Sequence, residues 1–216
     1  MKASQTKRAA AGVVVALSMH ACGGAGAPPQ IAPTPATRSG EDLAELEALY
    51  RARADSALTR FTEADVHFMT GMIGHHAQAL VMSRMAPTHD ASPSIQTLAA
   101  RTINAQQDEI ATMRGWLADR GQPMHDMGVM PGMLTPEQMR ELDAARGLEF
   151  DRLFLTYMIQ HHSGAVTMVH ELFATDGAAL GDTVFKVASD IQVDQASEID
   201  RMERMLEALP REDRRQ

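Results

Sequence analysis

The chain repeats one unusual stretch in which two adjacent histidines interrupt an apolar helical pattern. Residues 72–82 read MIGHHAQALVM and residues 158–168 read MIQHHSGAVTM, so both have the form M-I-x-H-H-x-x-A-x-x-M. The similarity extends to downstream segments of the form Q-x-x-E-I-x-x-M at 106–113 and 195–202. Each half of the chain is therefore predicted to be a helical hairpin, with the histidines on its first helix and the glutamate on its second.

Helical periodicity runs through most of the remaining sequence, and no stretch alternates apolar and polar residues as a half-buried strand does. Two similar hairpins pack most simply as an antiparallel four-helix bundle with a pseudo-twofold axis. The sequence thus predicts an all-α fold in which residues 62–210 form one domain. Its parts are a leading helix over 41–61, a first hairpin over 62–120, a Met-rich loop with a short helix over 121–147, and a second hairpin over 148–210.

Capping residues and helix breakers indicate where the helices should begin and end. Thr62 and Asp65 form the pattern of a capping box, and Ser92 is expected to cap a helix that starts with Pro93. Gly121 is expected to end that helix. The leading helix carries an apolar stripe at helical spacing, formed by Leu43, Leu46, Leu49 and Tyr50.

Residues 1–21 have the composition of a secretory signal. Three basic residues precede an uncharged run that is too short to span a bilayer as a stable helix. Cys22, the only cysteine, follows a stretch similar to a bacterial lipobox, so we expect lipidation and a membrane anchor there. The alternative is an ordinary signal peptide that is cut nearby. Residues 22–40 are rich in Gly, Ala and Pro and are predicted to form a flexible tether. The signal peptide and the anchor together predict an exported protein of the bacterial cell envelope.

The charge and the absence of familiar motifs narrow the function classes. The formal net charge is −8, and removal of the basic leader makes the chain more acidic still, which argues against a nucleic-acid partner. An acidic chain is compatible with attracting cations. The sequence contains no pattern typical of a nucleophilic triad, a phosphate-binding loop or a dinucleotide fingerprint, so we expect a protein that is not an enzyme.

The doubled H-H motif with its Q-x-x-E-I-x-x-M partners resembles the bacterial family catalogued as domain of unknown function 305. The resemblance covers about residues 60–208 and includes the stretch PGMLTPEQMRELDAARGLEFDRLFLTYMIQHHSGAVTM. It implies a ferritin-like fold and an envelope protein that binds copper or another metal. It also implies metal ligation by the paired histidines and their methionine neighbours, the histidines being His75, His76, His161 and His162.

Helix geometry and ligand chemistry support the same hypothesis independently. Adjacent side chains on a helix point about 100° apart. One histidine of each pair should therefore face the bundle axis while the other lies at its shoulder, and the sequence does not say which. Imidazole with thioether suits Cu(I), whereas imidazole with carboxylate suits Cu(II), Zn or Fe. Beside the histidines, the candidate ligands are Met72, Met82, Met158, Met168, Glu109 and Glu198.

A second candidate copper site lies in the loop between the hairpins. Spaced thioethers can gather around Cu(I) without a preformed cage, and the loop supplies Met124, His125, Met127, Met130 and Met133. The alternative is that these methionines only cover the end of the bundle. The isolated histidines His67, His89 and His170 are expected to be surface or structural residues.

Three functions remain open from the sequence. The first is copper binding for sequestration or handover, with another divalent metal as a variant of the same role. The second is a ferritin-like di-metal oxidase, which requires Glu-x-x-His pairs that are missing at the corresponding positions. The third is a structural or partner-binding bundle, in which histidine–glutamate pairs are compensated core groups and the methionines are flexible apolar filler.

Overall fold

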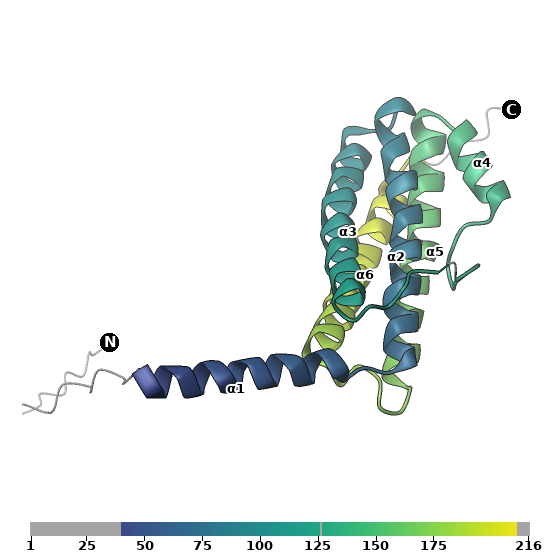
Figure 1. Ribbon diagram of the computed structural model, residues 1–216. Helices are drawn as coiled ribbons and strands as arrows, with labels where there is room; N and C mark the ends of the chain where they lie inside the picture. The colour runs from purple at the N-terminus through teal and green to yellow at the C-terminus, as the bar shows by residue number, and fades with distance from the viewer. Residues whose placement is uncertain (1–39, 126, 211–216) are drawn as a thin grey trace, which may run out of the picture. The chain divides into compact units, whose positions relative to one another are not determined.

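A computed structural model describes residues 40–125 and 127–210 (Figure 1). The predicted signal peptide, Cys22 and nearly all of the predicted tether lie outside the described residues. Every regular element in the described part is helical. The elements are α1 (Gly40–Thr59), α2 (Glu63–Met85), the 3₁₀ turn η1 (Ala86–Thr88), α3 (Pro93–Asp119), α4 (Pro136–Ala144), α5 (Gly147–Phe173) and α6 (Asp182–Ala208).

Helices α2 to α6 belong to one structural unit, which spans residues 44–216. Helix α2 packs along α3, and α5 packs along α6, so each pair forms a hairpin. Helices α2 and α5 lie side by side and join the two hairpins, while α3 and α6 have few contacts (Figure 1). The predicted all-α fold with two helical hairpins is confirmed, and the finer assignment to ferritin-like bundles stays a prediction.

The capping box at the start of α2 forms as predicted. The Thr62 hydroxyl accepts the Asp65 N–H, and the Asp65 carboxylate accepts the Thr62 N–H at 2.8 Å. Ser92 occupies the predicted N-cap position of α3 ahead of Pro93, but its side chain makes no capping hydrogen bond and lies 3.0 Å from the Ser94 hydroxyl. Gly121 follows α3 with a φ of +60°, as a glycine that ends a helix does.

Two buried aspartates at corresponding positions of the repeat connect the hairpins. Asp65 of α2 accepts the N–H of Ala179, in the connection between α5 and α6, at 2.7 Å. Asp151 of α5 accepts the N–H of Ser92, in the connection between η1 and α3, at 3.1 Å. Each hairpin thus supplies a carboxylate to a backbone donor in the other. A buried donor that loses its partner costs about 1–3 kcal/mol, so these contacts help to fix how the hairpins meet.

The apolar core consists of two clusters that lie at different heights along the helices. The first cluster draws on residues 68–73 of α2 and 165–172 of α5, and the second on 79–86 of α2 and 150–158 of α5. Both histidine pairs lie between these segments of α2 and α5, so their rings form a polar layer between the two apolar clusters.

Helix α1 forms over nearly the predicted range, but its apolar stripe is not buried. Leu43, Leu46, Leu49 and Tyr50 are all exposed to solvent. Within the part of the chain that the structure describes, no helix combines the length and the apolar character needed to cross a membrane.

Candidate metal centre

All four histidines of the H-H pairs are completely buried, with none of their surface exposed. One histidine of each pair was expected to face the bundle axis and the other to lie at its shoulder, and the structure buries both. The reason is that α2 and α5 each have neighbours on more than one side. The first histidine of each pair lies between α2 and α5, and the second points toward the partner helix of its own hairpin.

The second histidine of each pair contacts a glutamate of the Q-x-x-E segment. The Nε2 of His76 lies 2.6 Å from a carboxylate oxygen of Glu109, and the Nε2 of His162 lies 2.7 Å from one of Glu198. An ionised carboxylate only accepts hydrogen bonds, so the Nε2–H of each ring is the donor. The structure therefore brings these predicted residues together in two equivalent pairs, one in each half.

The first histidines of the two pairs meet across the interface between α2 and α5. The ring centroids of His75 and His161 are 3.8 Å apart, and the rings are tilted by 38°. The Nε2 of His75 lies 3.0 Å from the carbonyl oxygen of Pro131, and that of His161 lies 3.0 Å from the carbonyl oxygen of His75. A carbonyl can only accept, so both rings carry their proton on Nε2 and leave Nδ1 with a free lone pair.

None of the four Nδ1 atoms has a hydrogen-bond partner within the described part of the chain, although all four are buried. A buried polar atom without a partner is costly and calls for an explanation. Histidines that bind metals typically use one ring nitrogen for the metal and donate the other N–H to a carboxylate or a backbone carbonyl. All four rings here direct Nε2 to a carboxylate or a carbonyl oxygen. Nδ1 is then the nitrogen that could bind a metal ion.

Burial also keeps the two central rings in the form that binds metals. Burial, and then the nearby His76, lower the pKa of His75 from 6.5 to about 3. Burial and the contact with His75 hold the pKa of His161 well below its ordinary range. Both imidazoles are therefore neutral near pH 7, and a metal ion would not have to displace a proton from either one.

The four predicted methionine ligands are divided between the two apolar clusters. Met72 and Met168 belong to the first apolar cluster, and Met82 and Met158 belong to the second. Across residues 40–125 and 127–210, no three His, Cys, Asp or Glu side chains are grouped so that they could hold a metal ion together. The arrangement offers a pair of central imidazoles flanked by two histidine–glutamate pairs, and it is not a closed cage.

The sequence did not indicate that the Met-rich loop closes over this layer. The Gln78 side chain of α2 both donates to and accepts from the backbone of Leu134, at 3.1 and 2.7 Å. On α5, a Cβ at Gly164 would lie only 2.0 Å from the Pro131 oxygen, so only glycine allows the loop this close. These contacts hold the Pro131 carbonyl against His75. An isolated glycine inside the helical pattern was the signal that could have revealed the close approach.

The predicted loop ligands differ in their surroundings. Met124 and His125 are exposed, and the Nδ1 of His125 lies 3.3 Å from the carbonyl oxygen of Pro123. Met127, Met130 and Met133 are half-buried. The five predicted loop residues thus differ in how far they are exposed, and their role as ligands stays a prediction. The isolated His89 is buried and contacts the carbonyl oxygens of Met85 and Asp143, as expected for a structural histidine.

A cleft between α3 and α6 leads toward the histidine–glutamate pairs. A cavity of about 250 Å³ is lined there by both glutamates and by the buried amides of Gln106 and Gln195. Both amide atoms of Gln106 and the Oε1 of Gln195 have no partner among the described residues. Burial, and then the charges of Glu109, Asp190 and Glu198, raise the pKa of the neighbouring Asp194. Arg101 and Arg201 also line the cavity, so basic side chains partly balance its three acidic ones.

Comparison with known proteins gives the chain a family. It matches the family described as Domain of unknown function (DUF305) over residues 65–206, and it belongs to that family. No curated protein matches the chain.

Solved structures of the family resemble this one. A DUF305 protein from Streptomyces coelicolor, named as a secreted protein, is 26% identical with a TM-score of 0.62, and the match covers 67% of this chain and 92% of that one. A DUF305 fragment from Deinococcus radiodurans is 28% identical with a TM-score of 0.62, over 69% and 99% of the two chains. CopM in its Cu(I)-bound form is 28% identical with a TM-score of 0.55, over 66% and 95%. CopM has also been solved in Cu(II)-bound and Ag-bound forms.

Proposed function

We propose that this protein binds copper through the buried Nδ1 atoms of His75 and His161, and that it sequesters the metal or hands it on without catalysing a reaction. The observation that carries the proposal is the state of these two rings. Each is neutral, donates its Nε2–H to a carbonyl, and keeps a buried lone pair without a partner. Two imidazole nitrogens from facing helices can bind Cu(I), and the nearby carboxylates would adapt the site to Cu(II) or another divalent metal.

The flanking histidine–glutamate pairs and the cleft between α3 and α6 also have a role in this proposal. Glu109 and Glu198 hold His76 and His162 by their Nε2–H groups, which is how carboxylates orient and strengthen imidazole ligands. The cleft between α3 and α6 gives cations a route to these pairs. The copper-bound forms of CopM, a neighbour at 28% identity, make copper the first metal to test.

The proposed location is the bacterial cell envelope. The Streptomyces coelicolor neighbour is named as a secreted protein, and residues 1–21 of this chain have the composition of a signal peptide. Lipidation at Cys22 is part of the proposal and can be tested separately, by mass spectrometry of the mature N-terminus.

A structural role without metal is the second candidate. One observation in its favour is that the histidine and the glutamate of each pair satisfy one another without a ligand. Another is that the described residues contain no closed group of metal ligands. A di-metal oxidase is less well supported, since each half contributes only one glutamate to this layer.

The deciding experiment titrates the purified, metal-free protein with Cu(I) under anaerobic reducing conditions, and separately with Cu(II) and Zn. Native mass spectrometry gives the number of ions bound, and competition with a chromophoric chelator gives the affinity. The test variant is His75→Leu/His161→Leu, which keeps the layer filled with apolar side chains. The control is His170→Asn, which changes an exposed histidine of the same helix α5.

Copper affinity should fall by roughly tenfold or more in the double variant, because the loss of a residue of a metal site typically weakens binding on that scale. It should stay unchanged in the control. Circular dichroism should show that the double variant remains helical. If it binds every metal as tightly as the parent protein, the buried imidazoles are not the ligands and the structural role is the better account.

A further inference from the structure

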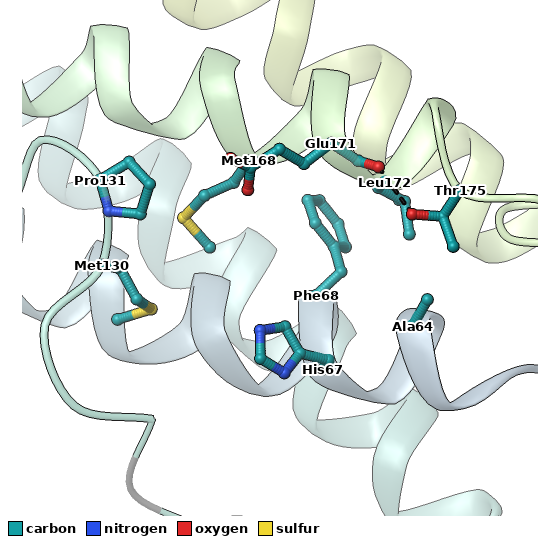
Figure 2. A pocket seen from close by; sticks show the side chains of 9 residues that line it. All are labelled: Ala64, His67, Phe68, Met130, Pro131, Met168, Glu171, Leu172 and Thr175. Atoms are coloured by element: carbon teal, nitrogen blue, oxygen red, sulfur yellow. Dashed lines mark hydrogen bonds between the residues drawn. The ribbon is translucent and has the colours of Figure 1, made fainter.

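A cavity of about 130 Å³ lies between α2, α5 and the Met-rich loop, and none of the four paired histidines lines it. Its donor groups are the thioethers of Met130 and Met168, the imidazole of His67 and the carboxylate of Glu171. Figure 2 shows the two methionines beside each other on one side of the cavity, with the His67 ring at its lower edge. His67 and Glu171 are exposed, so the cavity can be reached from solvent.

The methionines come together where α2 has no side chain. A Cβ at Gly71 would lie 3.1 Å from the sulfur of Met130 and 3.3 Å from the terminal methyl of Met168, with Met127 next at 4.0 Å. Gly71 follows His67 by one helical turn, so both residues lie on the same face of α2. Thioethers from the loop and from α5 therefore meet over the helix that also carries the imidazole.

The two halves of the chain differ at this face. The positions that correspond to His67 and Gly71 in the second half are Leu153 and Tyr157. Tyr157 fills its position with a ring whose hydroxyl donates to Glu141 of α4. The first half thus has a glycine and a histidine where the second half has two large side chains, and the donor-lined cavity occurs beside the first half.

From this geometry we infer a second metal site, formed by Met130, Met168 and His67 with Met127 at its border, that takes a soft monovalent cation such as Cu(I) or Ag(I). Thioethers select soft ions and are poor ligands for Cu(II), Zn or Mg. The neighbouring carboxylate of Glu171 adds a negative charge that suits a monovalent cation. The inference deepens the proposed copper-binding function and rests on it for the biological metal, but it uses different residues and has a narrower metal preference.

The residues that line this cavity differ from the loop ligands that the sequence predicted. Met124 and His125 are exposed and do not line the cavity, whereas Met168 of α5 and His67 of α2 do. The loop contributes through Met130, which packs against the first apolar cluster. A loop methionine held between a helix and a cavity loses less conformational entropy on binding than a free one would.

The test uses Ag(I), which is soft and does not change its oxidation state under these conditions. The purified protein, labelled with ¹³C at the methionine methyl groups, is titrated with Ag(I) and followed by NMR, and native mass spectrometry counts the bound ions. The variant is Met130→Leu/Met168→Leu, which preserves apolar volume. The matched control is Met82→Leu, because Met82 occupies the position of the first half that corresponds to Met168, and it is completely buried in the other cluster.

The methyl signals of Met130 and Met168 should shift on addition of Ag(I), and that of Met82 should not. The Met130→Leu/Met168→Leu variant should bind one silver ion fewer, while Met82→Leu binds as many as the parent protein. Binding of Cu(II) and Zn should be the same in all three proteins.

The inference is overturned if the Met130 and Met168 signals stay in place at saturating Ag(I), or if the double variant binds as many ions as the parent. Repeating the titration in the His75→Leu/His161→Leu background separates the two proposals. Methyl shifts that persist there, with the copper site lost, support both. If the His75→Leu/His161→Leu variant loses copper binding and Ag(I) shifts no methionine methyl signal in either protein, the histidine site is supported and the methionine site is overturned.

Discussion

Acidification should destabilise this protein, and removal of His75 should reduce that effect. The pKa of His75 is about 3 in the folded chain and 6.5 in its ordinary state, because the ring is buried. The ring is neutral when folded, whereas the unfolded chain takes up a proton as the pH falls below 6.5. The stabilising contribution is therefore fully present above pH 6.5 and is lost progressively between pH 6.5 and about 3.

The magnitude follows from the number of protons that only the unfolded chain binds. One pKa unit corresponds to about 1.4 kcal/mol. Between pH 7.5 and 5.5, a single histidine that titrates only in the unfolded state reduces the free energy of unfolding by about 1.4 kcal/mol. His161 has its pKa lowered in the same direction. His161 should therefore add to the loss of stability that His75 causes over this range, most of which lies above the titration of ordinary carboxylates.

The assay is urea unfolding, followed by circular dichroism, of metal-free protein at several values between pH 5.5 and 7.5. Three chains are compared: the parent, His75→Leu, and His170→Asn as a control with an exposed histidine. The loss of unfolding free energy on acidification should be about 1.4 kcal/mol smaller in His75→Leu than in the parent, and the control should behave like the parent. Equal pH dependence in His75→Leu and the parent would show that His75 titrates normally in the fold, and the argument about its neutral ring would be refuted.

Three further predictions concern the contacts that hold the loop and the two hairpins together. Gly164→Ala places a methyl group 2.0 Å from the Pro131 oxygen, so the loop must move away. Urea unfolding should show that the free energy of unfolding falls by about 1–3 kcal/mol. An unchanged unfolding curve would mean that the loop does not need this contact. Asp151→Ala should cost about 1–3 kcal/mol by leaving the Ser92 N–H without a partner. Asp65→Ala should cost about 1 kcal/mol more, since it also removes the capping box of α2, and equal costs would contradict that role.

The helices could be predicted because their signals are local. The capping box at Thr62 and the glycine at 121 act within a few residues of the helix ends that they define. Ser92 also occupies its expected N-cap position ahead of Pro93, but its polar groups have partners other than the first turn of α3. Its N–H donates to Asp151, which is far away in the sequence, and its hydroxyl lies against Ser94. No local pattern indicates that partner.

The candidate site was predictable only in part, for a similar reason. The repeat indicated that His76 and Glu109 correspond to His162 and Glu198, and the structure places each pair in contact. Helical periodicity assumes one buried face, whereas α2 has α3 on one side and α5 on another, so both histidines of its pair are buried. The position of the loop depends on Gln78 and Gly164, which occupy corresponding positions in the two halves. Gln78 binds the loop through its side chain, whereas Gly164 allows the loop to approach because it has no side chain.

The most direct test of the central claim is to observe the histidine ring nitrogens while metal binds. Long-range ¹H–¹⁵N NMR distinguishes protonated, free and metal-bound nitrogens of each ring, and Ag(I) or anaerobic Cu(I) keeps the protein diamagnetic. The account predicts that His75 and His161 carry their proton on Nε2 in the metal-free protein, and that their Nδ1 signals alone shift when metal is added. Nδ1 signals that stay unchanged at saturating metal, or rings protonated on Nδ1 before metal is added, would contradict it.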